Sequence, residues 1–218
     1  MPELPEVEQV RKTLLPHIKG KTITKVEVYL DRLVKHPSSE QFIKNLTGRT
    51  IEDVCRRGKY LVLKTGVDQK LIVHLRMTGS LVAQAGDLEA PPYAKIKFEL
   101  TDGVTMWFCD IRTFGTLYLV TDDDCYIAGY ETLGPEPLTV GFNPEYLAPI
   151  AAKSRKPIKT LILDQTVIAG LGNIYADECL ALAGILPTRI ANTWTRAEIE
   201  AVHEAANKVI AQGIANRG

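Results

Sequence analysis

The sequence predicts an α+β protein in which a β-rich first part is followed by a helical second part. Up to about residue 121, short runs rich in β-branched residues are separated by Gly or Asp-Gly turns such as Thr101-Asp102-Gly103. After Gly134-Pro135-Glu136-Pro137 these runs stop, and apolar residues recur at helical intervals. We therefore expect a β-sandwich or barrel followed by an all-α domain.

The elements follow from these patterns in chain order. Apolar residues at helical spacing between Val7 and Leu15, closed by Pro16 and Gly20, predict a first amphipathic helix at 3–17. Strands are expected at 22–30, 49–56, 59–65, 70–76, 95–101, 104–109 and 115–121. Helices are expected at 143–152, 155–163, 173–183 and 195–213. The predicted domain limits are 1–134 for the β part, 135–146 for a linker and 147–218 for the helical part.

The composition is that of a soluble globular protein, with 218 residues, of which 45% are hydrophobic and 24% charged. No apolar run is long enough to cross a membrane, and the N-terminus carries acids where a signal peptide would carry basic residues. We therefore expect a cytoplasmic protein without a membrane partner. The cysteines, Cys55, Cys109, Cys125 and Cys179, form no Cys-x-x-Cys pair, so neither a zinc site nor a disulfide framework is predicted.

The charge is distributed unevenly along the chain. A net charge of zero argues by itself against a nucleic-acid partner. However, residues 1–75 carry a net charge of +5, residues 76–150 carry −7 and residues 151–218 carry +2. A local basic face could therefore bind a polyanion despite the neutral total.

The N-terminus holds the most informative residues. Removal of Met1 would leave Pro2 with a secondary amine, and more of an α-amino group than of a lysine is unprotonated near neutral pH. Attack of this amine on an aldehyde-like carbon gives a cationic iminium ion, which is an electron sink. The alternative is that Pro2 only directs methionine removal, while Glu3 and Glu6 favour the start of the first helix.

A glycine-rich turn precedes the predicted helix at 173–183. Gly170 and Gly172 permit a close approach of backbones, and a helix that begins near Asn173 would direct amide groups at an anion such as a DNA phosphate. The alternative is a corner between two helices in which the glycines only allow packing.

Four separated parts of the chain together resemble the bacterial formamidopyrimidine-DNA glycosylase family of base-excision repair enzymes. They are Pro2-Glu3-Leu4-Pro5-Glu6-Val7-Glu8, Arg57-Gly58-Lys59-Tyr60, His74-Leu75-Arg76-Met77-Thr78-Gly79 with Asp110-Ile111-Arg112-Thr113-Phe114-Gly115-Thr116, and Ala169-Gly170-Leu171-Gly172-Asn173-Ile174-Tyr175-Ala176-Asp177-Glu178. The resemblance implies an N-terminal β-sandwich flanked by helices, an all-α helix–two-turn–helix DNA-binding domain and a small zinc-finger hairpin.

The resemblance implies a bifunctional DNA glycosylase and abasic-site lyase for oxidised purines, such as 8-oxoguanine and formamidopyrimidines, in duplex DNA. Pro2 would be the nucleophile, forming an iminium (Schiff-base) intermediate that leads to β,δ-elimination. Glu3 would shuttle protons to the opened sugar. Glu6 would assist, although helix capping or hydrogen bonding is an equally good role for it. Lys59 is assigned to the lesion and its flanking phosphates.

The resemblance also implies a set of DNA contacts. Met77 would fill the gap left by the everted nucleotide, Phe114 would insert beside the estranged base, and Arg112 would hydrogen-bond that base. The remaining predicted DNA-binding residues are His74, Arg76, Lys159, Asn173 and Tyr175. For an unrelated chain, the preferred interpretation of Arg112 and Phe114 would be a strand end with an exposed arginine and a core phenylalanine.

Three other functions remain as alternatives. The related endonuclease VIII branch shares the terminal Pro-Glu and prefers oxidised pyrimidines, but Leu4, Met77 and the Arg112/Phe114 pair favour the purine branch. A catalytically silent module that binds damaged DNA is the second. A tautomerase-like enzyme that uses the terminal proline as a base is the third, and it leaves the helix–two-turn–helix segment unexplained.

The sequence departs from the family at its end. It stops at Gly218, about where the lesion-capping loop of the family begins, and it lacks the two Cys-x-x-Cys pairs of the zinc finger. We therefore predict no metal or other cofactor for these residues, and expect zinc only if the finger is present in a longer protein. A fragment or an incomplete reading frame is expected. The predicted protein is a monomer that binds damaged double-stranded DNA at the bacterial nucleoid.

Overall fold

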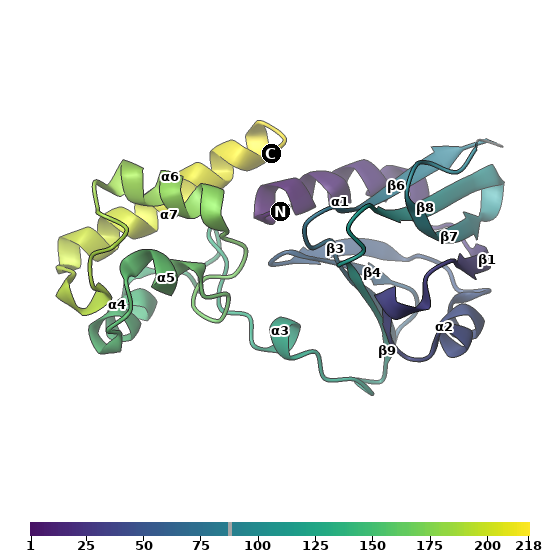
Figure 1. The fold of residues 1–218 in the computed structure, drawn as a ribbon, viewed down its shortest axis with the longest axis horizontal. Coiled ribbons are helices and arrows are strands. Elements are labelled where there is room, and N and C mark those ends of the chain that lie inside the picture. The colour runs from purple at the N-terminus through teal and green to yellow at the C-terminus, as the bar shows by residue number, and fades with distance from the viewer. Residues whose placement is uncertain (87–88) are drawn as a thin grey trace. The chain divides into compact units, whose positions relative to one another are not determined.

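The computed structural model describes residues 1–86 and 89–218 of the chain. Contacts between residues divide the chain into two compact units. The first comprises Met1–Pro2 and Val7–Tyr126, and the second comprises Glu3–Glu6 and Ile127–Gly218. Figure 1 shows that the strands belong to the first unit and that the second is helical, so the predicted α+β class is confirmed. The domain limits given by the sequence stay a prediction.

The first unit is a β-sandwich. Its four-stranded sheet has the order β1 (Ile23–Val28), β7 (Ala94–Leu100), β8 (Val104–Asp110) and β6 (Gly79–Ala85). Its five-stranded sheet has the order β2 (Val34–His36), β9 (Thr116–Thr121), β5 (Gln69–His74), β4 (Tyr60–Lys64) and β3 (Asp53–Arg57). Neighbouring strands are antiparallel except β2 and β9, which are parallel. Phe98 and Phe108 of one sheet and Leu61 of the other are fully buried in a shared core.

Two helices cover this core with their apolar sides. α1 (Leu4–Ile18) buries Val7 and Leu14 in it, and α2 (Ser39–Leu46) buries Phe42. Short 3₁₀ turns lie at Asp31–Leu33 and Thr101–Gly103. The predicted first helix is thus confirmed within one residue at each end.

The sequence prediction omits β2, α2 and β6. β6 was missed because Gly79–Ala85 is rich in small residues and carries a single β-branched side chain, Val82, so its intrinsic preference for a strand is weak. The segment nevertheless pairs with β8 along its whole length, from Gly79 opposite Asp110 to Ala85 opposite Val104. Pairing in the folded sheet therefore decides this strand, and local propensity does not.

The second unit is built from helices around a separate core. They are α3 (Ala128–Glu131), α4 (Pro144–Lys153), α5 (Ile158–Leu163), α6 (Asn173–Ala183) and α7 (Arg196–Ala215), with a 3₁₀ turn at Ala191–Thr193. Leu180 and Val202 are fully buried between α6 and α7. α5 begins three residues later than predicted, directly after Pro157. No helix within the described residues is long and apolar enough to span a membrane.

A capping box starts α7, and it supplies a test of the fold. The Thr195 hydroxyl accepts the N–H of Glu198 at 3.3 Å, and the Glu198 carboxylate accepts the N–H of Thr195 at 2.8 Å. Thr195→Ala should lower the free energy of unfolding by about 1 kcal/mol, because the Glu198 amide loses its acceptor. Thr195→Ser keeps the hydroxyl and is the matched control. Urea unfolding followed by circular dichroism measures the stability of both variants. A Thr195→Ala variant as stable as the unmodified protein would contradict the assigned cap.

Candidate active site

A hollow in the first unit brings together the N-terminal residue and three of the predicted site residues. It has a volume of about 390 Å³ and is lined by Met1, Arg76, Met77, Phe114 and Thr116. Met77 and Phe114 are 43% and 51% exposed, although both side chains are large and apolar. Such side chains on the wall of a hollow indicate a binding surface. Pro2 is bonded to Met1 and therefore lies next to this surface.

The register of the strands explains why residues distant in sequence meet here. Tyr60 lies opposite His74, and His74 lies opposite Thr116, so β4, β5 and β9 end side by side. In the other sheet, Gly79 lies opposite Asp110. The β3–β4 turn, the turn before β6 and the β8–β9 connection are thereby gathered at one end of the sandwich.

Lys59 occupies the β3–β4 turn and is buried. It follows Gly58, which has a φ of +56°, a left-handed conformation that suits glycine. A lysine in a turn is usually exposed, yet Lys59 is only 5% exposed. Its charge also reaches His74, whose pKa it helps to lower. The structure thus brings together Lys59 and His74, as the shared end of β4 and β5 requires.

His74 is a buried, neutral acceptor. Its Nδ1 accepts the backbone N–H of Arg76 at 3.0 Å, and its ring meets that of Tyr60 edge-on, with centroids 4.5 Å apart. Burial, assisted by the charges of Arg76 and Lys59, lowers the pKa of His74 to about 3. The ring proton therefore lies on Nε2 at neutral pH. The bond to Nδ1 holds Arg76 at a φ of +56°, which begins the turn that carries Met77.

Asp110 organises the connection that carries Arg112 and Phe114, and sequence reasoning gave it no role. Its carboxylate is 1% exposed and accepts the Thr78 hydroxyl at 2.5 Å, the Arg112 N–H at 3.2 Å and the Gly115 N–H at 2.8 Å. The Arg112 guanidinium lies 5.1 Å from the centre of the Phe114 ring. An acid at the end of the apolar strand β8 was the available signal, because a buried carboxylate requires several donors.

In the second unit, Glu3 is bound by the first turn of α6. Its carboxylate is 3% exposed and accepts the N–H groups of Gly172 at 2.7 Å, Ile174 at 3.0 Å and Tyr175 at 3.3 Å. These are amides that a helix leaves without partners at its N-terminus, and the helix dipole favours a negative charge there. Glu3 therefore acts as the cap of a helix about 170 residues further along the chain.

The glycine-rich turn allows Glu3 and Leu4 to approach its backbone closely. A Cβ on Gly172 would lie 2.3 Å from the Glu3 carboxyl carbon, and one on Gly170 would lie 2.5 Å from a Leu4 methyl carbon. The Leu4 N–H also donates to the Gly170 carbonyl at 3.1 Å. The sequence prediction that these amides face a DNA phosphate thus needs a correction: in the structure they donate to the carboxyl group of Glu3.

Glu6 makes the capping and hydrogen-bonding contacts that the sequence offered as alternatives to a catalytic role, and the catalytic role stays a prediction. One carboxylate oxygen accepts the N–H of Glu3 at 2.7 Å, which caps α1, and the other accepts the Tyr175 hydroxyl at 2.9 Å. Tyr175 is 6% exposed. Its burial raises the pKa of its phenol, and the hydrogen bond to Glu6 and the charge of Glu6 raise it further. The structure therefore places Tyr175 in the interior, where it holds Glu6, and its predicted contact with DNA stays a prediction.

The two other predicted residues of the second unit differ in their surroundings. Lys159 forms an ion pair with Asp177 on α6 at 2.7 Å. Asn173 is exposed at the first position of α6, and its side chain makes no hydrogen bond within the part of the chain that the structure describes. Asn173 is thus available to an external group, whereas Lys159 already has a partner.

Metal ligands do not gather in the described residues. No group of three or more His, Cys, Asp or Glu side chains there could hold a metal ion. Cys109 and Cys179 are buried, Cys55 and Cys125 are partly buried, and none of these four residues forms a disulfide. The residues present therefore do not fit a zinc ion, and the absence of a cofactor stays a prediction.

The buried His74 predicts a pH dependence of stability. Because its pKa is about 3 in the folded protein and about 6.5 when unfolded, the unfolded chain takes up the proton first. The stability is therefore complete above pH 6.5 and falls as the pH decreases towards 3. His74→Asn should reduce the loss of unfolding free energy between pH 6.5 and 5 by about 1.5 kcal/mol. Urea titrations at both pH values measure this loss. If the unmodified protein and His74→Asn lose the same unfolding free energy between the two pH values, the result argues against a neutral His74.

Comparisons with known proteins agree with this geometry. Residues 1–117 match the model of the formamidopyrimidine-DNA glycosylase N-terminal domain, and residues 133–218 match that of the formamidopyrimidine-DNA glycosylase H2TH domain. The formamidopyrimidine-DNA glycosylase of Moorella thermoacetica is 44% identical over 219 residues, covering 100% of this chain and 80% of that protein. That of Geobacillus kaustophilus is 41% identical over 220 residues, with the same 100% and 80% coverage.

A solved structure extends the match to three dimensions. The formamidopyrimidine-DNA glycosylase of Lactococcus lactis, non-covalently bound to DNA containing an abasic site, superposes with a TM-score of 0.92 at 37% identity. The match covers 99% of this chain and 83% of that chain. The sandwich, the helix–two-turn–helix domain and the predicted resemblance are thereby confirmed. The chain belongs to the formamidopyrimidine-DNA glycosylase family.

Proposed function

We propose that this protein is a bifunctional DNA glycosylase and abasic-site lyase that excises oxidised purines from duplex DNA. One observation carries the proposal: the N-terminal residue lines the same hollow as Arg76, Met77 and Phe114. A nucleophile at the chain terminus is then next to apolar side chains that can replace a nucleotide in the stack. Related structures contain DNA with formamidopyrimidine-dG or carbocyclic 8-oxo-G, which supports purine lesions as substrates.

The chemistry begins at Pro2 after removal of Met1. The Pro2 nitrogen forms a bond to C1′ of the damaged nucleotide as the glycosidic bond breaks, and the proton of the Pro2 amine leaves with the base. Glu3, which follows Pro2 directly in the chain, takes up a proton from water and delivers it to the sugar oxygen as the C1′–O4′ bond breaks and the ring opens to an iminium ion. Loss of a C2′ proton then breaks the C3′–O bond, and a second elimination breaks the C5′–O bond. Water finally hydrolyses the iminium and releases Pro2.

The exposed side chains of the hollow serve eversion of the damaged nucleotide. Met77 fills the space that the nucleotide leaves, and Phe114 inserts beside the opposite base, which offsets part of the lost stacking energy of a few kcal/mol. Arg112, stacked near Phe114, hydrogen-bonds the opposite base. Lys59 contacts the lesion and its flanking phosphates.

The remaining proposed contacts position the duplex. Asn173 binds a phosphate through its exposed side chain. His74 and Arg76 contribute through the turn that they form, and Lys159 exchanges Asp177 for a phosphate. We further propose that the protein acts as a monomer in the cytoplasm of a bacterium, the kind of organism from which its relatives come.

The nucleophile can be tested directly. With an abasic-site duplex and sodium borohydride, the protein that has lost Met1 should give a covalent adduct, because borohydride reduces the iminium to a stable amine. Pro2→Gly should lower base excision by at least about tenfold, and an N-terminal tag should abolish the adduct. Intact mass spectrometry confirms the state of the N-terminus in each sample. A tagged protein that still forms the adduct would rule out the terminal amine.

The role of Glu3 predicts a division between the two activities. Glu3→Gln should slow excision of 8-oxoguanine more than cleavage at an abasic site, because an abasic sugar opens to its aldehyde unaided and depends less on the proton that Glu3 delivers. Gly172→Ala should act in the same direction, since its Cβ would displace the Glu3 carboxylate. Single-turnover rates on both substrates measure the ratio. Equal losses on both substrates would contradict the assignment of Glu3.

A further inference from the structure

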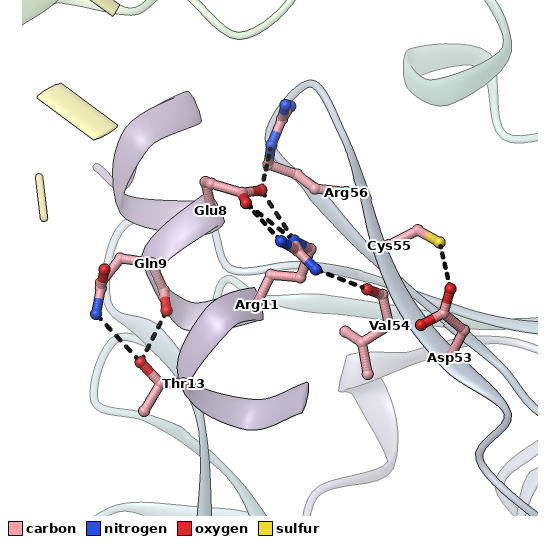
Figure 2. A network of polar contacts seen from close by, with 8 residues as sticks. All are labelled: Glu8, Gln9, Arg11, Thr13, Asp53, Val54, Cys55 and Arg56. Carbon is pink, nitrogen blue, oxygen red and sulfur yellow. Dashed lines mark hydrogen bonds and ion pairs between the residues drawn. The ribbon is translucent and has the colours of Figure 1, made fainter. Parts of the chain in front are cut away.

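Glu8 lies at the centre of a charge network in the first unit. Figure 2 shows its carboxylate between two guanidinium groups: Arg11 Nη2 donates to it at 2.7 Å, and Arg56 Nε donates to it at 3.3 Å. The Glu8 and Arg56 side chains are each 14% exposed. Burial acts to raise the pKa of Glu8, but the hydrogen bonds and charges of Arg11 and Arg56 outweigh it and hold the pKa below its usual value. Glu8 is therefore an ionised, partly buried anchor for both arginines.

The two arginines connect Glu8 to different parts of the β3–β4 hairpin. Arg11 Nη1 donates to the Val54 carbonyl within β3 at 3.4 Å. Arg56 Nη1 donates to the Gly58 carbonyl at 3.0 Å, which lies in the turn itself. This carbonyl belongs to the peptide group that joins Gly58 to Lys59. Its direction therefore constrains where the Lys59 side chain starts.

This constraint matters because Lys59 is held in an unusual place. A lysine in a two-residue turn has several rotatable bonds and normally extends into water. Here the Lys59 side chain is buried, and its charge lies close enough to His74 to help lower the pKa of that residue. Keeping such a group in one place requires support from surrounding residues that are themselves fixed.

We propose that Glu8 and Arg56 are positioning residues for Lys59. The ion pair fixes the Arg56 guanidinium, the guanidinium fixes the Gly58 carbonyl, and the carbonyl sets Lys59 against the damaged nucleotide. The inference rests on the proposed function, in which Lys59 acts at the lesion. Glu8 touches no substrate and acts only through Arg56. Arg11 shares Glu8 but does not reach the turn, so it provides a matched control.

A double-mutant cycle tests the proposal. Arg56→Ala, Lys59→Ala and the combined variant are compared with Arg11→Ala in single-turnover excision of 8-oxoguanine and in borohydride trapping on abasic DNA. Arg56→Ala should slow excision by about tenfold or more, because small displacements in a site cost large factors in rate. In the Lys59→Ala background the same change should cost less than about twofold. Arg11→Ala should retain excision, with melting temperatures confirming that all variants are folded.

Glu8→Gln separates positioning from a direct contact of Arg56 with DNA, and it replaces Arg56→Ala in the cycle if that variant does not fold. If Arg56 is a positioning residue, Glu8→Gln should slow excision and lose this effect when Lys59 is Ala. If Arg56 binds DNA itself, Glu8→Gln should leave excision unchanged or faster, and additive effects of Arg56 and Lys59 would overturn the inference. Absence of any adduct with the unmodified protein would instead reject the proposed function.

Discussion

The hydrogen bonding of the Glu3 carboxylate to the first turn of α6 is the interaction on which the site of the second unit depends. Three backbone amides and a buried carboxylate satisfy one another, and removing either partner would leave buried polar groups unpaired at about 1 to 3 kcal/mol each. Gly170 and Gly172 follow from this contact, because any side chain there would collide with Leu4 or Glu3. Glu6 and Tyr175 extend it by fixing the first turn of α1. Glu3, the residue next to Pro2, is thus held in one position, as the proton transfer proposed for it requires.

The first unit applies the same principle to its turns. The buried Asp110 accepts three hydrogen bonds and fixes the backbone from Arg112 to Gly115, and the neutral His74 fixes the backbone of Arg76. Both acceptors lie at the ends of paired strands, where the sheet determines their position. The side chains that these turns present, Met77 and Phe114, are exposed and apolar. Rigid backbone beneath these side chains suits the insertion into a base stack that we propose for them, because little conformational entropy is then lost on binding.

His74 is a buried neutral group next to the hollow, and Glu8 is an ionised acid next to the β3–β4 hairpin. Burial keeps His74 neutral beside two cations, so the positive charge of the turn region resides on Lys59 and Arg76. Glu8 is ionised because two guanidinium groups surround it, and this makes it a fixed support for the β3–β4 hairpin. The two cations of this region are thus held by different groups: the His74 ring accepts the backbone N–H of Arg76, and Glu8 pairs with the arginine that binds the carbonyl before Lys59.

The sequence by itself determined the order of most strands and helices, the amphipathic first helix, the hairpin that carries Lys59 and the family to which the chain belongs, because periodicity, turn residues and terminal motifs are local signals. It also identified Arg76, Met77 and Phe114, which share one hollow. Only the tertiary structure decided the strand β6, the role of Asp110, the burial of Tyr175 and the occupant of the glycine-rich turn. Each of these depends on a partner far away in the sequence: β8 for β6, Thr78 for Asp110, and Glu3 and Glu6 for the first turn of α6. A local pattern can show that an amide or a carboxylate needs a partner, but the identity of that partner is fixed only when the chain packs.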